Sequence, residues 1–240
     1  GVMDRASSMP YHEPVLVEAV VTFLAPRPGG VVVDATCGTA GHSLAFLPHL
    51  LPDGRLIAVD RDADALTIAR QRLADFGAQA PSPTSISRGS SSPAGGSMAV
   101  GGADPAASGK LMEGQVTFHH GNFLELSAIL RSLDLARVDG VLLDLGMSSL
   151  QVERPERGFS FLREGPLDMR MDVRRPLTAA TLVNELSEQD LAQLLWTLGE
   201  ERFSRRIARR IVAERRRHPI ATTTELARLV QQAVPRRAAH

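Results

Sequence analysis

The chain has 240 residues, of which 43% are hydrophobic and 22% charged, and its formal net charge is zero. This length allows one large domain, or a domain with a subdomain, around an ample core. No apolar run approaches the length of a membrane span, the first residues do not form a secretory signal, and a single cysteine excludes an internal disulfide framework. We therefore expect a cytoplasmic protein without membrane attachment.

The first half of the chain alternates short β-branched runs with segments of helical periodicity. The spacing of apolar residues predicts helices that open at Pro14, begin at about Ser43, end at Gly77 and cover residues 126–133. Runs typical of buried parallel strands cover residues 31–34, 55–60, 116–120 and 140–144. This repeated alternation indicates an α/β fold with a doubly wound parallel sheet.

Residues 78–114 interrupt the alternation. The segment is dominated by Ala, Gly, Ser and Pro and has almost no large apolar residues. Such a composition buries too little surface to offset its ordering entropy, so we predict a disordered low-complexity insertion. The domain tolerates the insertion because the entropy of loop closure grows slowly with loop length.

The pattern changes beyond residue 150. Residues 151–175 are rich in charge, Gly and Pro, and three helical stretches follow, around Ser187, around Phe203 and from Thr222. We therefore predict a sheet domain over residues 9–150 and a helical subdomain over residues 151–240.

Basic residues gather near the end of the chain. Residues 200–240 hold eleven arginines against four glutamates. This clustering suits a polyanionic partner such as RNA. It suits a solvated helix face equally well.

Polar and glycine residues follow the ends of the predicted strands, which is where ligands bind in an open α/β sheet. These residues are Asp34 with the glycine turn after it, Asp60, the segment 121–123, and Asp144. Because the carboxyl ends of parallel strands meet at one edge of the sheet, we expect these residues to line a single crevice.

The glycine turn after Asp34 disfavours a dinucleotide. Its spacing is Gly38-x-x-Gly41, whereas a pyrophosphate is cradled by G-x-G-x-x-G, so a nicotinamide-dependent oxidoreductase is not expected. Asp60, at the end of the second strand, suits the two hydroxyls of an adenosine ribose. Phe123 suits either an adenine face or the core. Together these residues favour a nucleoside without a diphosphate, and S-adenosylmethionine is the candidate cofactor.

Longer sequence motifs carry more specific information. The two longest are Glu-Arg-Gly-Phe-Ser-Phe at 156–161 and Gly-Pro-Leu-Asp-Met-Arg-Met-Asp at 165–172. Shorter motifs occupy residues 11–16, 34–43, 59–62, 142–149, 198–203 and 206–209. In their order along the chain, these motifs resemble those of the RsmH (MraW) family of methyltransferases. The resemblance covers the whole chain except the insertion and the first eight residues.

The resemblance implies a Rossmann-like class I S-adenosylmethionine methyltransferase fold, whose first four parallel strands precede an inserted helical subdomain. It implies that the later strands are absent from this chain, which we expect to be a C-terminally truncated fragment. The activity implied is N4-methylation of a cytosine in the decoding region of small-subunit (16S) ribosomal RNA. The implied partner is that RNA or the assembled small ribosomal subunit.

The resemblance also implies which residues contact S-adenosylmethionine: Ala40, Gly41, His42, Asp60, Phe123, Asp144 and Gln151. The pattern of strand ends adds Asp34. The chain departs from the family in its first loop, where Ala35, Thr39 and Ala40 stand in place of the usual glycines. A position that requires positive φ would carry strain there.

For the chemistry we expect the cytosine amine to attack the methyl group in line, with the protein providing mainly positioning. Asp144 is the candidate catalytic residue, because a carboxylate that accepts the amine's N–H bonds localises the nitrogen lone pair. Phe159 or Phe161 could stack on an extruded base, although a core or loop-anchoring role is the alternative for both. Arg206 and Arg209 are predicted to contact the RNA.

Two kinds of chemistry are not expected. The histidines lack companions at metal-ligand spacing, so no metal site is predicted. Cys37 is expected to pack rather than to act as a nucleophile, since methylation of an amine needs no covalent adduct. A non-catalytic RNA-binding or assembly module stays open as an alternative function, and binding of S-adenosylmethionine separates it from an enzyme.

Overall fold

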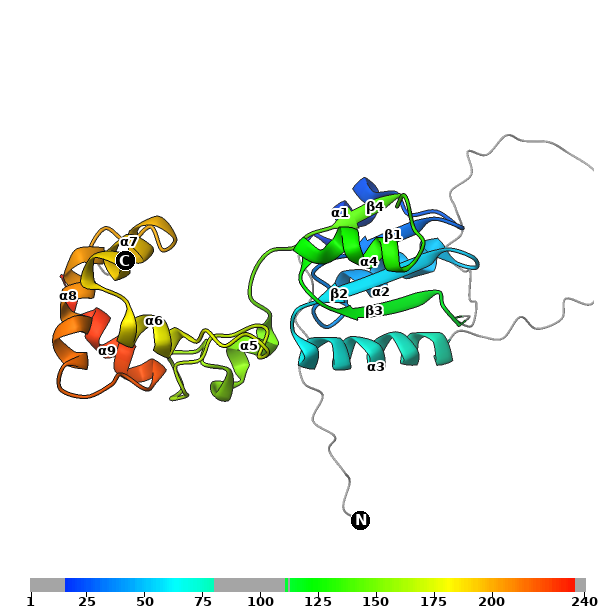
Figure 1. The fold of residues 1–240 in the computed structure, drawn as a ribbon. Coiled ribbons are helices and arrows are strands. Elements are labelled where there is room, and N and C mark those ends of the chain that lie inside the picture. Colours follow the sequence, from blue (N-terminus) through cyan, green and yellow to red (C-terminus); the bar gives the residue numbers. More distant parts are fainter. Residues whose placement is uncertain (1–15, 80–110, 112, 236–240) are drawn as a thin grey trace, which may run out of the picture. The chain divides into compact units, whose positions relative to one another are not determined.

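The computed structural model describes residues 16–79, 111 and 113–235 (Figure 1). The chain divides into two compact units, Gly1–Leu145 and Gly146–His240, and each is described by itself. The expected helix start at Pro14 and most of the predicted insertion, residues 80–110 and 112, lie outside the described residues.

A four-stranded parallel sheet forms the centre of the first unit. β1 (Val31–Asp34) lies between β2 (Arg55–Asp60) and β4 (Gly140–Leu142), and β3 (Val116–His120) pairs with the other side of β2. The order β3-β2-β1-β4 confirms the predicted doubly wound α/β fold, because the first four strands of that fold run in this order. The carboxyl ends of β1 and β4 therefore flank the topological switch point.

Helices cover both faces of this sheet. On one face, Val32 and Leu56 pack against α2 (Gly41–Leu50) and α3 (Ala63–Gln79), with α1 (Val17–Leu24) at the margin. On the other face, Val33 and Ile57 pack against the 3₁₀ helix η1 (Phe123–Glu125) and against α4 (Leu126–Ser132). Burial on both faces explains why the central strands are continuous apolar runs in the sequence.

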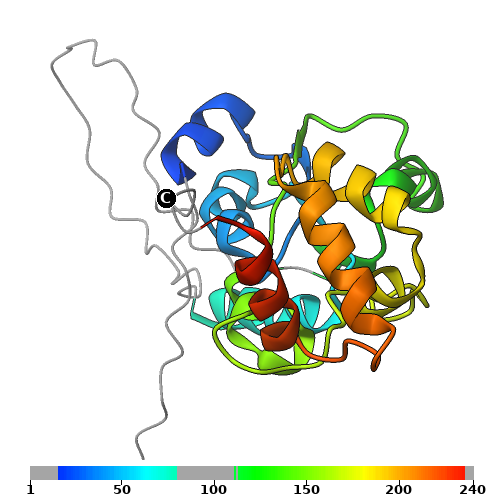
Figure 2. The same ribbon diagram turned by 90° about the vertical axis from the view of Figure 1, so that its left-hand side faces the viewer.

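The second unit is helical. Helices α7 (Glu188–Thr197) and α9 (Thr223–Ala233) pack against α8 (Ser204–Arg215), as Figure 2 shows. Their apolar cluster includes Leu191, Ile207 and Leu229. Within the described residues, no helix is both long and apolar enough to cross a membrane. The elements of this unit are α5 (Ser149–Glu153), η2 (Pro155–Arg157), α6 (Ala179–Glu185), α7 (Glu188–Thr197), α8 (Ser204–Arg215) and α9 (Thr223–Ala233).

The expected helix end at Gly77 is wrong, because α3 continues to Gln79. A Cβ at Gly77 would lie 3.0 Å from the side chain of Leu111, which packs on the end of this helix. Gly77 thus permits a close approach of another segment instead of capping the helix. A glycine inside a helix costs only about 1 kcal/mol, which the neighbouring turns can absorb.

Other boundaries also differ from the expected ones. α2 begins at Gly41 rather than near Ser43, and β4 ends at Leu142 rather than Asp144. The end of β4 follows from its partner, since Leu142 pairs with Asp34, the last residue of β1. The short helices α5 and α6 were not expected, because five and seven residues are too few to show a helical period.

Candidate functional site

Asp34 closes β1 and fastens the loop that follows. Its carboxyl group is 1% exposed and accepts hydrogen bonds from Ser43 Oγ at 2.6 Å and from the Thr36 N–H at 3.4 Å. Burial raises the pKa of Asp34 to about 6, and the bond from Ser43 opposes that rise in part. Asp34 therefore holds α2 against the end of β1 while its carboxyl group faces the protein interior.

Cys37 lies next to this carboxyl group. Its side chain is 4% exposed, and the Sγ atom is 3.8 Å from Ser43 Oγ. Burial, and then the nearby charge of Asp34, raise the pKa of the thiol well above its usual value. A protonated, enclosed thiol packs and does not attack.

Asp60, at the end of β2, organises the glycine turn. Its Oδ2 accepts the Gly38 N–H at 2.7 Å and its Oδ1 accepts the Asp62 N–H at 2.8 Å. Gly38 has a φ of +52°, and an added Cβ there would meet no atom within 4 Å. The turn thus presents open backbone beside a carboxylate whose pKa burial raises.

Ala40 has the backbone strain that was expected if one of the residues replacing glycine in this loop had a positive φ. It has a φ of +68°, is fully buried and precedes the first turn of α2. Ala35 and Thr39 are not among the positive-φ residues. A left-handed alanine costs about 1–2 kcal/mol, so this chain maintains the turn against a local penalty that glycine would avoid.

Asp144 connects the end of β4 to the same loop. Its backbone N–H donates to Thr36 Oγ1 at 2.7 Å, and its Oδ2 lies 3.9 Å from Nδ1 of His42. The Asp144 side chain is 61% exposed, whereas that of His42 is 10% exposed. An exposed carboxylate held by its own backbone at the switch point is available to a ligand.

Phe123 opens η1 beside the end of β3. Asn122 accepts the Leu124 N–H at 3.0 Å, and the Asn122 N–H donates to Glu125 at 3.2 Å, so a capping box fixes the start of this turn. The ring is half-buried and packs on the cluster that contains Val33 and Val59. Phe123 therefore contacts the core through part of its surface, and contact of its ring with an adenine face stays a prediction.

Six of the predicted cofactor residues converge around the loop between β1 and α2. They are Asp34, Ala40, Gly41, His42, Asp60 and Asp144. The charges of His42 and Asp60 both act on Asp34, which shows how closely the group is placed. The carboxylates of Asp60 and Asp144 beside an open turn repel a diphosphate and suit ribose hydroxyls and a cation, whereas the buried Asp34 supports the turn from the interior. The donor set therefore fits S-adenosylmethionine, which carries a sulfonium, an ammonium group and a ribose.

Sequence reasoning missed Thr36 and Ser43 as parts of this arrangement. Thr36 Oγ1 accepts from the backbone of Asp144, and Ser43 donates to Asp34. The available signal was a hydroxyl residue two positions after a strand end and another in the first turn of the following helix. Such positions commonly bond to nearby backbone or carboxylate groups.

Gln151 belongs to the second unit. Its backbone N–H donates to Ser148 Oγ at 3.3 Å, and its side-chain oxygen accepts the Ser148 N–H at 3.1 Å, which makes a capping box for α5. The side chain is 4% exposed. These two hydrogen bonds are those of a residue that begins a helix.

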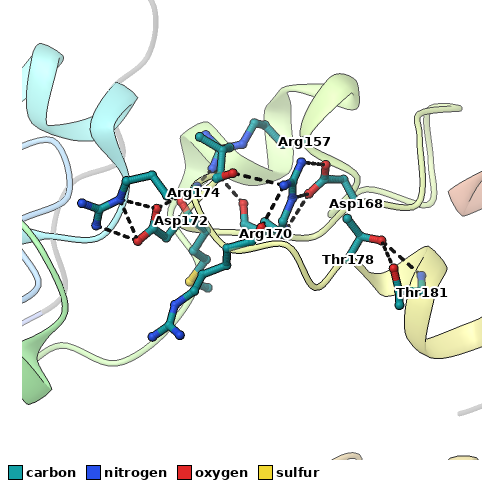
Figure 3. Close-up of polar contacts among 10 residues, drawn as sticks. Arg157, Asp168, Arg170, Asp172, Arg174, Thr178 and Thr181 are labelled. Carbon is teal, nitrogen blue, oxygen red and sulfur yellow. Dashed lines mark hydrogen bonds and ion pairs between the residues drawn. The ribbon is translucent and has the colours of Figure 1, made fainter.

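The two longest sequence motifs, residues 156–161 and 165–172, form one loop of the second unit that is held by hydrogen bonds and an ion pair (Figure 3). Asp168 receives a forked ion pair from Arg170, at 2.9 Å and 2.8 Å. The buried guanidinium of Arg157 donates to the carbonyls of Arg170 and Met171 at 3.2 Å and 3.3 Å. The hydrogen bonds of Asp168 and its attraction to Arg170 lower its pKa. The loop is thus held by its own charged groups.

The predicted substrate residues of this unit lie on two segments, Phe159 and Phe161 on the loop just described and Arg206 and Arg209 on α8. Phe159 is half-buried, and Phe161 is 64% exposed. Arg206 and Arg209 are exposed on α8 and line a groove with α7. No group of His, Cys, Asp and Glu among the described residues could hold a metal ion.

A parallel sheet in the order β3-β2-β1-β4, whose ends carry carboxylates and no pyrophosphate loop, has the Rossmann-like fold of class I S-adenosylmethionine-dependent methyltransferases. The model of the MraW methylase family matches residues 9–89 and 106–240. The chain belongs to this family.

Curated relatives are similar over nearly the whole chain. A protein of Syntrophotalea carbinolica named ribosomal RNA small subunit methyltransferase H is 42% identical over 93% of this chain and 60% of its own. Proteins of the same name from Brevibacillus brevis and Geobacter sulfurreducens are 40% and 42% identical over 94% of this chain. The chain spans about 60% of the length of these relatives.

Proposed function

We propose that this chain provides the cofactor site and part of the RNA-binding surface of a methyltransferase. The reaction is transfer of a methyl group to N4 of a cytosine in the decoding region of small-subunit ribosomal RNA. The cofactor is S-adenosylmethionine, which supplies an electrophilic methyl group when it is bound. Relatives named ribosomal RNA small subunit methyltransferase H, about 40% identical, support the substrate class.

The observation that carries the proposal is the acidic turn at the topological switch point, which consists of residues 36–40 and the neighbouring carboxylates of Asp60 and Asp144. Asp60 and the open backbone at Gly38 would hold the nucleoside part, and His42 lies in the first turn of α2, which follows this turn. Asp144 would face the reacting groups, because its carboxylate is exposed while its backbone is fixed by Thr36. In these roles the protein binds and orients, which suits a reaction that depends mainly on alignment.

Asp144 has a specific task in this scheme. The exocyclic amine of cytosine is a weak nucleophile, because its lone pair is delocalised into the ring. A carboxylate that accepts an amine N–H favours the nucleophilic geometry and the positive charge that develops on nitrogen. Asp144→Asn keeps the shape and removes the charge, so we expect it to lower the rate of methyl transfer by about 100-fold.

The test is nucleoside mass spectrometry on small-subunit RNA incubated with the protein and S-adenosylmethionine. N4-methylcytidine that forms with the unmodified protein and decreases with Asp144→Asn supports the proposal. The control is Asp75→Asn on the exposed side of α3, which should leave the yield unchanged. A product methylated on a ring carbon, or equal yields from the two variants, contradicts it. RNA binding without any uptake of S-adenosylmethionine would favour the non-catalytic module.

A further inference from the structure

Helices α7 and α8 of the second unit line a groove. Their inner faces meet in the apolar cluster through Leu191 and Ile207, each less than 4% exposed. Other side chains of the two helices, and side chains of the turn between them, line this groove of about 840 Å³.

Trp196 lies in this groove and is 58% exposed. It is the chain's one tryptophan, and it is absent from the apolar cluster that buries Leu191 on the same helix. Glu188, Ala192 and Trp196 are spaced by four residues and therefore form one stripe along α7. A large aromatic side chain left beside a groove offers a flat face to a ligand.

Four exposed arginines line the same groove. The guanidinium of Arg202 lies over the ring of Phe203, 4.7 Å from its centroid. Arg205, Arg206 and Arg209 follow on α8, where spacings of three and four residues place them side by side. Glu188 is the acidic residue among the groove's lining. The groove is therefore positively charged as well as aromatic.

The ion pair within the groove is weak enough to exchange. Arg209 Nε and Glu188 Oε1 are 3.7 Å apart, and their side chains are 75% and 48% exposed. Exposed pairs of this kind contribute little to stability. A phosphate can replace the Glu188 carboxylate on Arg209, with the fork geometry that guanidinium groups offer to phosphate oxygens.

We propose that this groove binds an unpaired segment of RNA, with one base stacked on Trp196 and the adjoining phosphates on the arginines. Stacking requires a base that is free of its partner, which favours unpaired RNA over a duplex. An acidic peptide would satisfy the arginines but would leave the indole without a flat partner. The choice of RNA among polyanions rests on the proposed function, whereas the base-and-phosphate chemistry rests on the groove itself.

The single tryptophan makes the groove directly observable. We would titrate the 240-residue chain, without S-adenosylmethionine, with an unstructured oligoribonucleotide and follow tryptophan emission and the anisotropy of the labelled RNA. We expect saturable quenching whose midpoint agrees with that of the anisotropy. The same strand in a duplex should bind more weakly and quench less.

Two sets of variants test the contacts. Trp196→Ala should weaken binding about tenfold, since the base would lose the aromatic side chain on which it stacks. Trp196→Phe should retain most of the affinity, and Leu198→Ala, at a residue 79% exposed outside the groove lining, should retain all of it. Arg206→Ala with Arg209→Ala should reduce the salt dependence, the slope of log K against log salt, by about 1.4.

The matched charge control is Arg216→Ala with Arg217→Ala, because both residues are exposed and lie outside the groove lining. Equal weakening by the two double variants would overturn the proposal, since binding would then follow net charge alone. Trp196→Ala with unchanged affinity, or quenching by polyglutamate as strong as by RNA, would overturn it as well. Because no cofactor is added, this titration tests the groove alone. A chain that binds RNA here but does not bind S-adenosylmethionine in a separate titration would count against the proposed function and not against the groove.

Discussion

Asp34 illustrates how one buried carboxyl group links loop structure to pH. Burial raises its pKa from 3.8 to about 6, so the folded protein binds this proton more tightly than the unfolded chain does. The resulting stabilisation is complete below the unfolded pKa and is lost as pH rises through the folded value. Stability from this group therefore falls between about pH 4 and pH 7.

Asp34→Asn should remove that pH dependence. Between pH 4 and pH 7 we expect the unmodified chain to lose about 2 kcal/mol more of its free energy of unfolding than the variant loses. Urea unfolding followed by circular dichroism at several pH values measures the difference. Asp60, whose pKa is also raised by burial, is present in both proteins, and its charge acts on Asp34, so the difference between the two curves measures Asp34 together with its coupling to Asp60. Parallel curves for the two proteins would show that Asp34 is ionised throughout this range.

Two glycines with positive φ should respond differently to alanine. Gly38 has a φ of +52° and open space around a Cβ, so Gly38→Ala should cost only the backbone strain, about 1 kcal/mol of unfolding free energy. Gly158 has a φ of +75°, and a Cβ there would collide with the Pro166 carbonyl and lie 2.7 Å from the Asp168 nitrogen. Gly158→Ala should cost about 3 kcal/mol. Denaturant unfolding that gave the two variants equal losses would contradict this assignment.

At the scale of elements, strands were predicted well and helix ends less well. β1 and β2 are buried on both faces, so their sequences are short apolar runs, and the shortness and β-branched residues of these runs favour a strand over a buried helix. The end of α3 was misplaced because Gly77 serves a contact with Leu111, which local sequence does not reveal. α6 was missed because its seven residues depend on a Thr178 cap and on tertiary bonds.

Arg215 supplies such tertiary bonds to α6. From the last turn of α8 it donates to the carbonyls of Val183 at 2.7 Å and Leu186 at 2.6 Å, at the end of α6. Arg215→Ala should lower the free energy of unfolding of the second unit by about 2 kcal/mol, because two carbonyls lose charged donors. Arg216→Ala, at an exposed neighbour, should stay within about 0.5 kcal/mol of the unmodified chain. Thermal and urea unfolding compare the two, and equal effects would mean that water replaces the Arg215 bonds.

At the scale of the whole molecule, sequence motifs were enough to identify the family, whereas the structural roles of the motifs could be seen only in the structure. The motifs at 156–161 and 165–172 form a loop held by Arg157 and by the pair Asp168–Arg170. Nothing in their residue types says which arginine pairs with which acid. Likewise, the sequence predicted that Asp34, Asp60 and Asp144 lie at one edge of the sheet. It did not predict that Thr36 and Ser43 hold this edge by hydrogen bonds, because these bonds depend on side-chain geometry. The groove of α7 and α8 could not be predicted, because charge alone does not separate a binding surface from a solvated one.

The central claim is that the acidic turn at the end of the sheet binds S-adenosylmethionine. The most direct measurement is a calorimetric titration of this chain with S-adenosylmethionine, beside Asp144→Ala and the control Asp75→Ala. Both carboxylates lie on exposed side chains, so the folds should survive, and circular dichroism verifies that they do. We predict saturable binding that Asp144→Ala weakens at least tenfold and Asp75→Ala leaves unchanged. A folded chain that gives no saturable heat, or equal affinities for the two variants, would contradict the claim.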